Sequence, residues 1–426
     1  MKSICLCRRL FILIVGIAFS FGAVDSASVM AQARRQPPSS DQKKNKRPPE
    51  GGQQTEDQKQ KQEPLPPDIL GKPQEAEKVS ITTNVVNVDA VVYNKATGQP
   101  SINLKKDNFA IFVDGVKKEI TNFASPEAPI TLTLVVEYSK TSEVLGYYGS
   151  NGMEPGQNEV IRPTAMFLSQ FITPQDYVSV IAYDLRPTPL TDFTNSPQRI
   201  QQVISLLLRN TPAFRDSNLF DALKLTLVGG RADSVVLEDS KESKSDYAGM
   251  VAVPGGRRKA VLLVASGLDT FSKINLDQAR KIVQNSGIPI YIIGTGQMFQ
   301  KRYGDRMDPG RGSSIGGIPI DRMTFLQADN TMKTFARESG GTFFPVTFEG
   351  EIPAVLGSIN AMLRSQYSLG FKPDDVHDGK SHKIVVKVDV DGDGQYDDKA
   401  YVVKAREVYN APKPDAASSK TGGGKQ

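Results

Sequence analysis

The sequence is poor in the side chains that most often build catalytic and metal centres. Its 426 residues include no tryptophan, two histidines and two cysteines. The histidines are His377 and His382. They leave few candidates for an imidazole metal site or a histidine-dependent nucleophilic triad. The cysteines, Cys5 and Cys7, both stand at the very start of the chain. If that start is removed, the mature protein can form no disulfide.

Strong charge and long apolar runs are also missing. A net charge of +5 is too mild to indicate nucleic acid binding, and none is expected. Residues 1–33 have the pattern of a secretory signal, with basic residues before the apolar run Leu10–Val24 and a small-x-small site at Ala31–Ala33. That run is short for a membrane span, so we expect none in the mature chain. An uncleaved N-terminal anchor is the alternative. The expected location is secreted, periplasmic or cell envelope.

Two segments lack the apolar residues that a folded core needs. Residues 34–78 are rich in Pro, Gln, Lys and Glu, and residues 410–426 are rich in Pro, Gly and Lys. Such compositions bury too little apolar surface to offset the entropy lost on ordering. We expect a disordered linker and a disordered tail.

Both flanks of the folded region have β-rich patterns, at 79–127 and 366–409. Asp114-Gly115 between apolar runs indicates a hairpin. Each flank has about 45 residues, near the size below which a domain usually needs disulfides, a metal or another folded segment to be stable. We therefore expect one composite β-sandwich into which residues 128–365 are inserted.

The central segment 128–365 alternates strand and helix patterns, which predicts a doubly wound, mostly parallel sheet of Rossmann type. Within it, residues 230–256 are expected to be a polar surface insertion and residues 297–322 a loop. The helices are expected at 158–171, 198–208, 217–227, 275–285, 323–338 and 352–363, and the strands at 130–137, 177–183, 190–193, 259–265, 288–294 and 341–346. Ser196-Pro197 indicates the start of the helix 198–208, because a serine cap followed by proline in the first turn is a helix start signal.

The expected central strand, Ile130–Glu137, is followed directly by oxygen-bearing side chains. Glu137, Ser139 and Thr141 stand at alternate positions after the apolar run. Open α/β sheets bind ligands at the carboxyl ends of their strands, and hard cations accept oxygen ligands of this kind. The stretch resembles the first loop of von Willebrand factor A-type domains, whose metal-ion-dependent adhesion site reads Asp-x-Ser-x-Ser.

Two further loops carry the same resemblance. Arg215–Leu223 is similar to the family's Gly-x-Thr-x-Leu-x-Asp-Ala-Leu, with Ser217 at the threonine position. Ala265–Thr270 is similar to Thr-Asp-Gly-x-Asp, with Ser266 at the aspartate and Asp269 at the later acidic position. The resemblance implies a site for Mg²⁺ or Mn²⁺.

The departures from the family pattern weaken that expectation. Glu137 is longer than the family's aspartate, Ser266 removes a negative charge and Lys140 adds a positive one. The alternative is a degenerate site whose hydroxyls hydrogen-bond one another and cap the loop backbone. The order of motifs over about residues 79–409, including Leu363–Gly370, is similar to a group of secreted bacterial proteins, common in acidobacteria, with a von Willebrand factor A-related domain.

A second acidic motif resembles the Asp-x-Asp-x-Asp-Gly calcium loop. Asp389, Asp391 and Asp393 take its first, third and fifth positions, and Asp397 the ninth. The twelfth position is Ala400, where such loops have a bidentate glutamate. Ca²⁺ is therefore one interpretation, and a solvated hairpin turn is the other.

The leading functional hypothesis is an exported, adhesion-type module that binds a protein partner at the carboxyl edge of the sheet. A metal-independent structural or scaffolding protein of the cell envelope is the first alternative. A hydrolytic enzyme using the same cleft is the second. We expect no enzyme, because no spacing in the sequence indicates a catalytic group.

Overall fold

The computed structural model describes residues 85–144, 160–171, 173–210, 212–232, 245–254, 257–303, 314–315, 318–319, 322–374 and 378–411. The chain divides into the unit Met1–Lys78 and the unit Val79–Gln426, and the described residues belong to the second. The predicted signal, linker and almost all of the predicted tail lie outside them. None of the described helices is both long and apolar enough to cross a bilayer.

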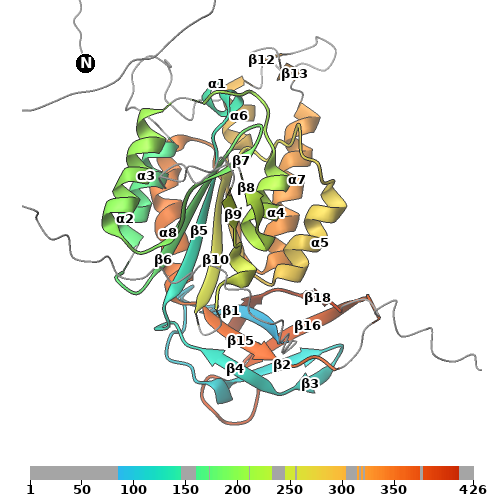
Figure 1. Ribbon diagram of the computed structural model, residues 1–426. Helices are drawn as coiled ribbons and strands as arrows, with labels where there is room; N and C mark the ends of the chain where they lie inside the picture. Colours follow the sequence, from blue (N-terminus) through green and yellow to red (C-terminus); the bar gives the residue numbers. More distant parts are fainter. Residues whose placement is uncertain are drawn as a thin grey trace, which may run out of the picture. The chain divides into compact units, whose positions relative to one another are not determined.

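A six-stranded sheet forms the centre of the α/β part (Figure 1). Numbered along the chain, its strands lie in the order 3-2-1-4-5-6, which is the doubly wound order of Rossmann-type folds. All neighbours pair in parallel except the edge strand β7, which is antiparallel to β6. The strands are β5 (Ile130–Glu137), β6 (Tyr177–Tyr183), β7 (Pro187–Thr194), β10 (Arg258–Ala265), β11 (Ile290–Gly294) and β14 (Phe343–Pro345).

Helices cover both faces of this sheet (Figure 1). Because side chains alternate along a strand, Leu134 of β5 packs in the core under α2, α3 and α8, whereas Val135 packs in the core under α4, α5 and α7. The α-helices are α1 (Lys140–Val144), α2 (Ile161–Phe171), α3 (Pro197–Arg209), α4 (Leu219–Val228), α5 (Leu276–Ser286), α6 (Gly296–Tyr303), α7 (Arg322–Ser339) and α8 (Ile352–Arg364).

Two four-stranded sheets lie outside the α/β part, in the orders β17-β1-β15-β4 and β18-β16-β2-β3. Each combines strands from before and after the α/β segment, with β1 paired antiparallel to both β15 and β17. The strands are β1 (Val86–Asn94), β2 (Phe109–Val113), β3 (Val116–Lys118), β4 (Ile120–Ala124), β15 (Tyr367–Phe371), β16 (Ser381–Val388), β17 (Tyr401–Ala405) and β18 (Val408–Asn410).

One buried cluster takes side chains from both of these sheets. At its centre the rings of Phe109 and Tyr367 lie 4.9 Å apart between centroids. The Tyr367 hydroxyl donates to the carbonyl oxygen of Ser101 at 2.8 Å and accepts from the backbone N–H of Leu104 at 3.0 Å. The two flanks of the chain therefore share a core and polar contacts.

Local signals in the sequence predicted several turns and caps correctly. Asp114 (φ 48°) and Gly115 (φ 86°) join β2 and β3 as an antiparallel hairpin, and both adopt the positive φ that such a turn requires. Ser196 caps α3 by accepting the N–H of Arg199, with Pro197 in the first turn.

Other local expectations are wrong. Residues predicted as a loop begin with the helix α6, whose Met298 and Phe299 are buried. In the predicted polar insertion, β8 (Gly230–Ala232) pairs with β9 (Ser245–Tyr247), and Tyr247 is buried against the sheet. A few apolar side chains anchor these polar stretches, which composition averages conceal. The last strand, β18, ends at Asn410, one residue into the predicted tail.

Shorter elements complete the described chain. They are the 3₁₀ turns at Lys106–Asn108, Met250–Ala252 and Glu349–Glu351, and the paired strands β12 (Ser314–Ile315) and β13 (Ile318–Pro319).

Candidate functional site

The candidate site lies where the strand order of the sheet reverses, between the carboxyl ends of β5 and β10. These strands are the first and fourth along the chain and are neighbours in the sheet. Doubly wound sheets bind ligands at this switch point, because the loops from the two strands diverge there and leave a crevice. The loops after β5, before α4 and after β10 carry the predicted residues.

Glu137 is the buried carboxylate of the site, with no exposed surface. Its Oε2 accepts the backbone N–H of Ser266 at 2.6 Å, and its Oε1 accepts the hydroxyl of Ser139 at 3.3 Å. Burial raises the pKa of Glu137, and the hydrogen bonds from Ser266 and Ser139 oppose that rise. No cationic side chain among the described residues contributes to the shift. Glu137 is therefore a buried acid without a counter-charge.

The hydroxyls of Thr141 and Ser217 connect the three loops. Thr141 Oγ1 donates to the carbonyl oxygen of Arg215 at 2.7 Å, and Ser217 Oγ donates to that of Leu268 at 2.8 Å. The backbone N–H of Ser217 also donates to Thr270 Oγ1 at 2.9 Å. Each of these hydroxyls still has lone pairs that can accept a hydrogen bond or coordinate a cation.

Ser266 and Asp269 have different roles in the third loop. The hydroxyl of Ser266 accepts the N–H of Leu268 at 3.3 Å. Asp269 Oδ1 accepts the N–H of Phe220 at 3.1 Å and the hydroxyl of Ser272 at 2.5 Å. Because Phe220 lies in the first turn of α4, Asp269 caps that helix, and burial raises the pKa of its carboxyl.

Direct contacts thus join Glu137, Ser139 and Ser266. Thr141 and Ser217 are linked to the same loops through backbone carbonyls, while the contacts of Asp269 point to α4.

Two residues that the sequence reasoning did not select also shape the site. Ser142 Oγ donates to the carbonyl oxygen of Ser139 at 2.6 Å and accepts the N–H of the same residue at 3.1 Å. Asp221 accepts the N–H groups of Lys273 at 2.9 Å and Ile274 at 3.3 Å. Asp221 belongs to the second-loop motif, which could have identified it from the sequence. No motif in the sequence indicated Ser142.

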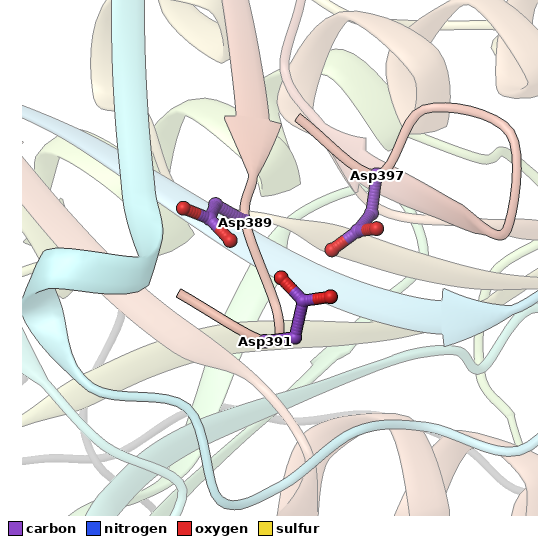
Figure 2. Close-up of side chains that lie close together, drawn as sticks. All are labelled: Asp389, Asp391 and Asp397. Atoms are coloured by element: carbon purple, nitrogen blue, oxygen red, sulfur yellow. The ribbon is translucent and has the colours of Figure 1, made fainter. Parts of the chain in front are cut away.

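A separate acidic cluster lies after β16. Asp389, Asp391 and Asp397 each place a carboxylate oxygen within 4.8 Å of the others, and Figure 2 shows the three side chains around one point. Asp393 is not in this group, and its Oδ1 instead accepts the N–H of Gln395 at 2.7 Å. The predicted loop therefore gathers three of its four acids.

The loop around these acids is held by its own backbone. Asp389 accepts the N–H groups of Gly392 at 2.7 Å and Gly394 at 2.9 Å, and both glycines have positive φ. Asp397 Oδ2 accepts the N–H of Val390 at 2.7 Å. The side-chain amide of Asn108 donates to the carbonyl oxygen of Asp389 at 2.7 Å, which anchors the loop.

Comparison with known proteins gives matches among solved structures only, since no protein-family profile and no curated protein matches the sequence. A von Willebrand factor type A protein from Catenulispora acidiphila is 8% identical, with 74% of this chain and 76% of that chain covered and a TM-score of 0.38. The vWF domain of the pilus tip protein Mfa5 from Porphyromonas gingivalis is 13% identical, with 55% and 94% covered and a TM-score of 0.33.

The PilB minor pilin from Streptococcus sanguinis is 10% identical, with 56% of this chain covered and a TM-score of 0.37, and the match spans 62% of the pilin. Two of these matched structures are von Willebrand factor A-type domains, to which this chain is similar.

Proposed function

We propose that this chain is an exported, adhesion-type module that binds a protein partner with the face at the carboxyl ends of β5 and β10. The observation that carries the proposal is Glu137, a fully buried carboxylate at the switch point that is contacted by two loops. A buried acid without a counter-charge is costly to keep ionised. A cation or a basic group from a partner would remove that cost.

A divalent cation fits this chemistry in part. Glu137 offers a carboxylate that contacts the hydroxyl of Ser139 and the backbone N–H of Ser266, and the hydroxyls of Thr141 and Ser217 stand on the same loops. Mg²⁺ or Mn²⁺ bound there would supply a positive charge for an acidic side chain of the partner. With one carboxylate at its centre, the site is a degenerate form of the adhesion site and its affinity for metal is weak.

The alternative is a scaffolding protein of the cell envelope that uses no metal. The donated hydroxyls of Thr141 and Ser217 favour it, because they already satisfy loop carbonyls. A hydrolytic role has less support, since the Ser139 hydroxyl that donates to Glu137 is fully buried and has no exposed surface from which to attack a substrate.

Calorimetric titration of the full chain with Mg²⁺, Mn²⁺ and Ca²⁺, followed by pull-down from envelope extract with and without chelator, separates these functions. Glu137→Gln removes the buried charge, and Asp277→Asn is a matched control at an exposed helix position. Chelator-sensitive capture that Glu137→Gln abolishes and Asp277→Asn retains supports the metal-assisted function. Capture unaffected by chelator and by Glu137→Gln supports the scaffold.

We also propose that Asp389, Asp391 and Asp397 hold a weak structural Ca²⁺. Three carboxylates within 4.8 Å repel one another unless a cation screens them, and the positive-φ glycines give the loop its sharp turn. Titration with Ca²⁺ should show binding that Asp397→Asn weakens about tenfold or more through the lost charge. Asp393→Asn lies in the same loop but outside the cluster and should change it little. Equal losses from both variants would mean that loop geometry alone is at work.

The flanks 79–127 and 366–409 are proposed to form one composite sandwich around the inserted segment 128–365. The position of β1 between β15 and β17 supports this arrangement. A fragment of residues 128–409 should then lose its C-terminal strands or aggregate. Protected amides over 382–408 in a soluble fragment would show that the two flanks fold independently. In this proposal residues 34–78 tether the module and the chain beyond Ala411 forms a free tail.

A further inference from the structure

A groove lies where the two small sheets part from the end of α7. It has a volume of about 670 Å³ and is lined by the C-terminal half of α7, the segment 340–345 and residues of β16 and β17. It is remote in sequence from the loops after β5 and β10. Gly340 shapes its floor, because a Cβ there would come within 2.7 Å of the backbone nitrogen of Arg406.

The lining is strongly basic. One acidic side chain, Glu407, faces a set of cationic ones, and none of these cations makes an ion pair within the described part of the chain. The cationic residues are Lys333, Arg337, Lys383, Lys404 and Arg406. Surface cations of a stable monomer usually have neighbouring acids, so this excess favours an anionic ligand.

The placement of individual cations strengthens that conclusion. Lys333 and Arg337 are exposed and stand four residues apart on α7, a spacing at which like charges repel. Arg406 meets the groove through its backbone, because a Cβ on Gly340 would lie 2.7 Å from its nitrogen. Its guanidinium lies instead against Gln284 and Gly287, and Nη1 donates to the carbonyl oxygen of Gln284 at 3.2 Å. The cations available to a ligand in the groove are therefore the lysines and Arg337.

The groove also contains an open strand edge. Among the described strands β17 pairs only with β1, so its other edge presents unpaired backbone groups to the groove. Val385 of the neighbouring β16 also lines the groove and is 37% exposed. A single lysine such as Lys404 is enough to discourage edge pairing between copies. The remaining cations need another explanation.

We propose that this groove binds an extended acidic segment of a protein partner, which adds as a strand to the free edge of β17. Main-chain hydrogen bonds to β17 give such a ligand its register, and its acidic side chains meet Lys333 and Arg337 of α7 and Lys383 of β16. The apolar side chains of alternate residues then cover Val385. An acidic protein strand fits better than a membrane surface, because the charges line a recess instead of a flat face.

Fluorescence anisotropy on the full chain tests this with a labelled peptide of about eight residues that alternates Glu and Val. Replacing its Glu with Gln should abolish binding, and N-methylation of alternate backbone nitrogens should weaken it at least about tenfold by removing ladder hydrogen bonds. Lys333→Glu with Arg337→Glu should cost a similar factor. Lys224→Glu with Lys281→Glu reverses two exposed helix lysines outside the groove and is the matched control.

Several outcomes would overturn the proposal. If both double variants weaken peptide binding equally, the net charge of the protein alone explains the effect. Undiminished binding of the N-methylated peptide would exclude strand addition. Tighter binding to phosphatidylglycerol vesicles or to a single-stranded oligonucleotide than to the peptide would assign the groove to another class of ligand. If the α7 variant unfolds, Lys404→Glu on β17 repeats the measurement. None of these readouts depends on metal at Glu137.

Discussion

The guanidinium of Arg258 donates a hydrogen bond of 2.9 Å from Nε to the carbonyl oxygen of Ala128. Its Nη1 also donates to the carbonyl oxygens of Leu363 and Gln366. Arg258 begins β10 and is 1% exposed. Ala128 lies where the chain enters the α/β part, and Leu363 and Gln366 lie where it leaves. One buried side chain therefore connects the segment that enters the α/β part with the segment that leaves it.

Arg258→Met should lower the free energy of unfolding by about 3 kcal/mol, because three buried carbonyls lose a charged donor. Urea unfolding measures the change, and Arg231→Met at an exposed position is the control. The expected signature is a larger loss of protection in β1 and β15 than in α4. If Arg258→Met lowers the free energy of unfolding no more than Arg231→Met does, the two segments are held together by packing alone.

Tyr367→Phe should cost about 1–2 kcal/mol, because the buried N–H of Leu104 and the carbonyl of Ser101 lose their partner while the ring stays in the core. Thermal unfolding followed by far-ultraviolet circular dichroism reports the change. Tyr401→Phe removes a hydroxyl from a half-buried tyrosine in the same sheet and should be close to neutral. Equal effects of the two changes would contradict the bridging role of Tyr367.

The pH dependence of stability should carry a contribution from His382. Its Nδ1 lies 2.7 Å from Asp114 Oδ2 and its Nε2 lies 3.3 Å from Asp378 Oδ1. The hydrogen bond to Asp114, with a further one to Asp378, raises the pKa of His382. The contact with His382 is also the main cause of the lowered pKa of Asp114. The pKa of Asp378 is lowered mainly by the backbone N–H of Lys380, and His382 adds to that effect.

Because the folded pKa of His382 exceeds its unfolded value of about 6.5, its stabilisation is complete below that pH and is lost as pH rises through the raised pKa. It also fails below about pH 4, where the aspartates protonate. The difference in melting temperature between the native chain and His382→Gln should therefore be largest from about pH 4 to 6.5. Burial raises the pKa of Asp89 to about 6. Because Asp89 titrates in both proteins, the difference between them cancels its contribution. A difference that does not change from pH 5 to 9 would show that the His382 pair is unimportant.

Glu137→Asp with Ser266→Asp should create or strengthen divalent binding, because it shortens one ligand by about 1.5 Å and adds a negative charge beside it. The backbone N–H of residue 266 already contacts the Glu137 carboxylate, so the new acid would lie next to the old one. The melting temperature should rise with millimolar Mg²⁺ or Mn²⁺ in the double variant and not in Ser266→Asn. No metal-dependent rise would mean that the two loops do not share a cation.

Some features were open to sequence reasoning because they depend on short-range patterns. The apolar run from Ile130 predicted a central strand, and it pairs with β6 and β10. Asp114-Gly115 and Ser196-Pro197 predicted their turn and cap because positive φ and a capping hydroxyl are local properties. Strand-helix alternation likewise predicted the doubly wound sheet. The three loop motifs indicated Glu137 together with Ser139 and Ser266, which contact it, but no motif indicated Ser142.

The tertiary structure alone decided which of these residues touch and what long-range contacts fix them. Asp269 and Ser266 are close in sequence, yet Asp269 caps α4 while the Ser266 N–H meets Glu137, because the path of the loop sets where each group points. Val402 has the pattern of a core residue but is 41% exposed, since β17 is an edge strand. Arg258 and the basic groove depend on segments far apart in the chain. By itself the sequence determined the elements and the candidate residues, because propensities and periodicity act locally. Only the folded chain decided their pairing, burial and counter-charges, because these depend on neighbours that sequence order does not reveal.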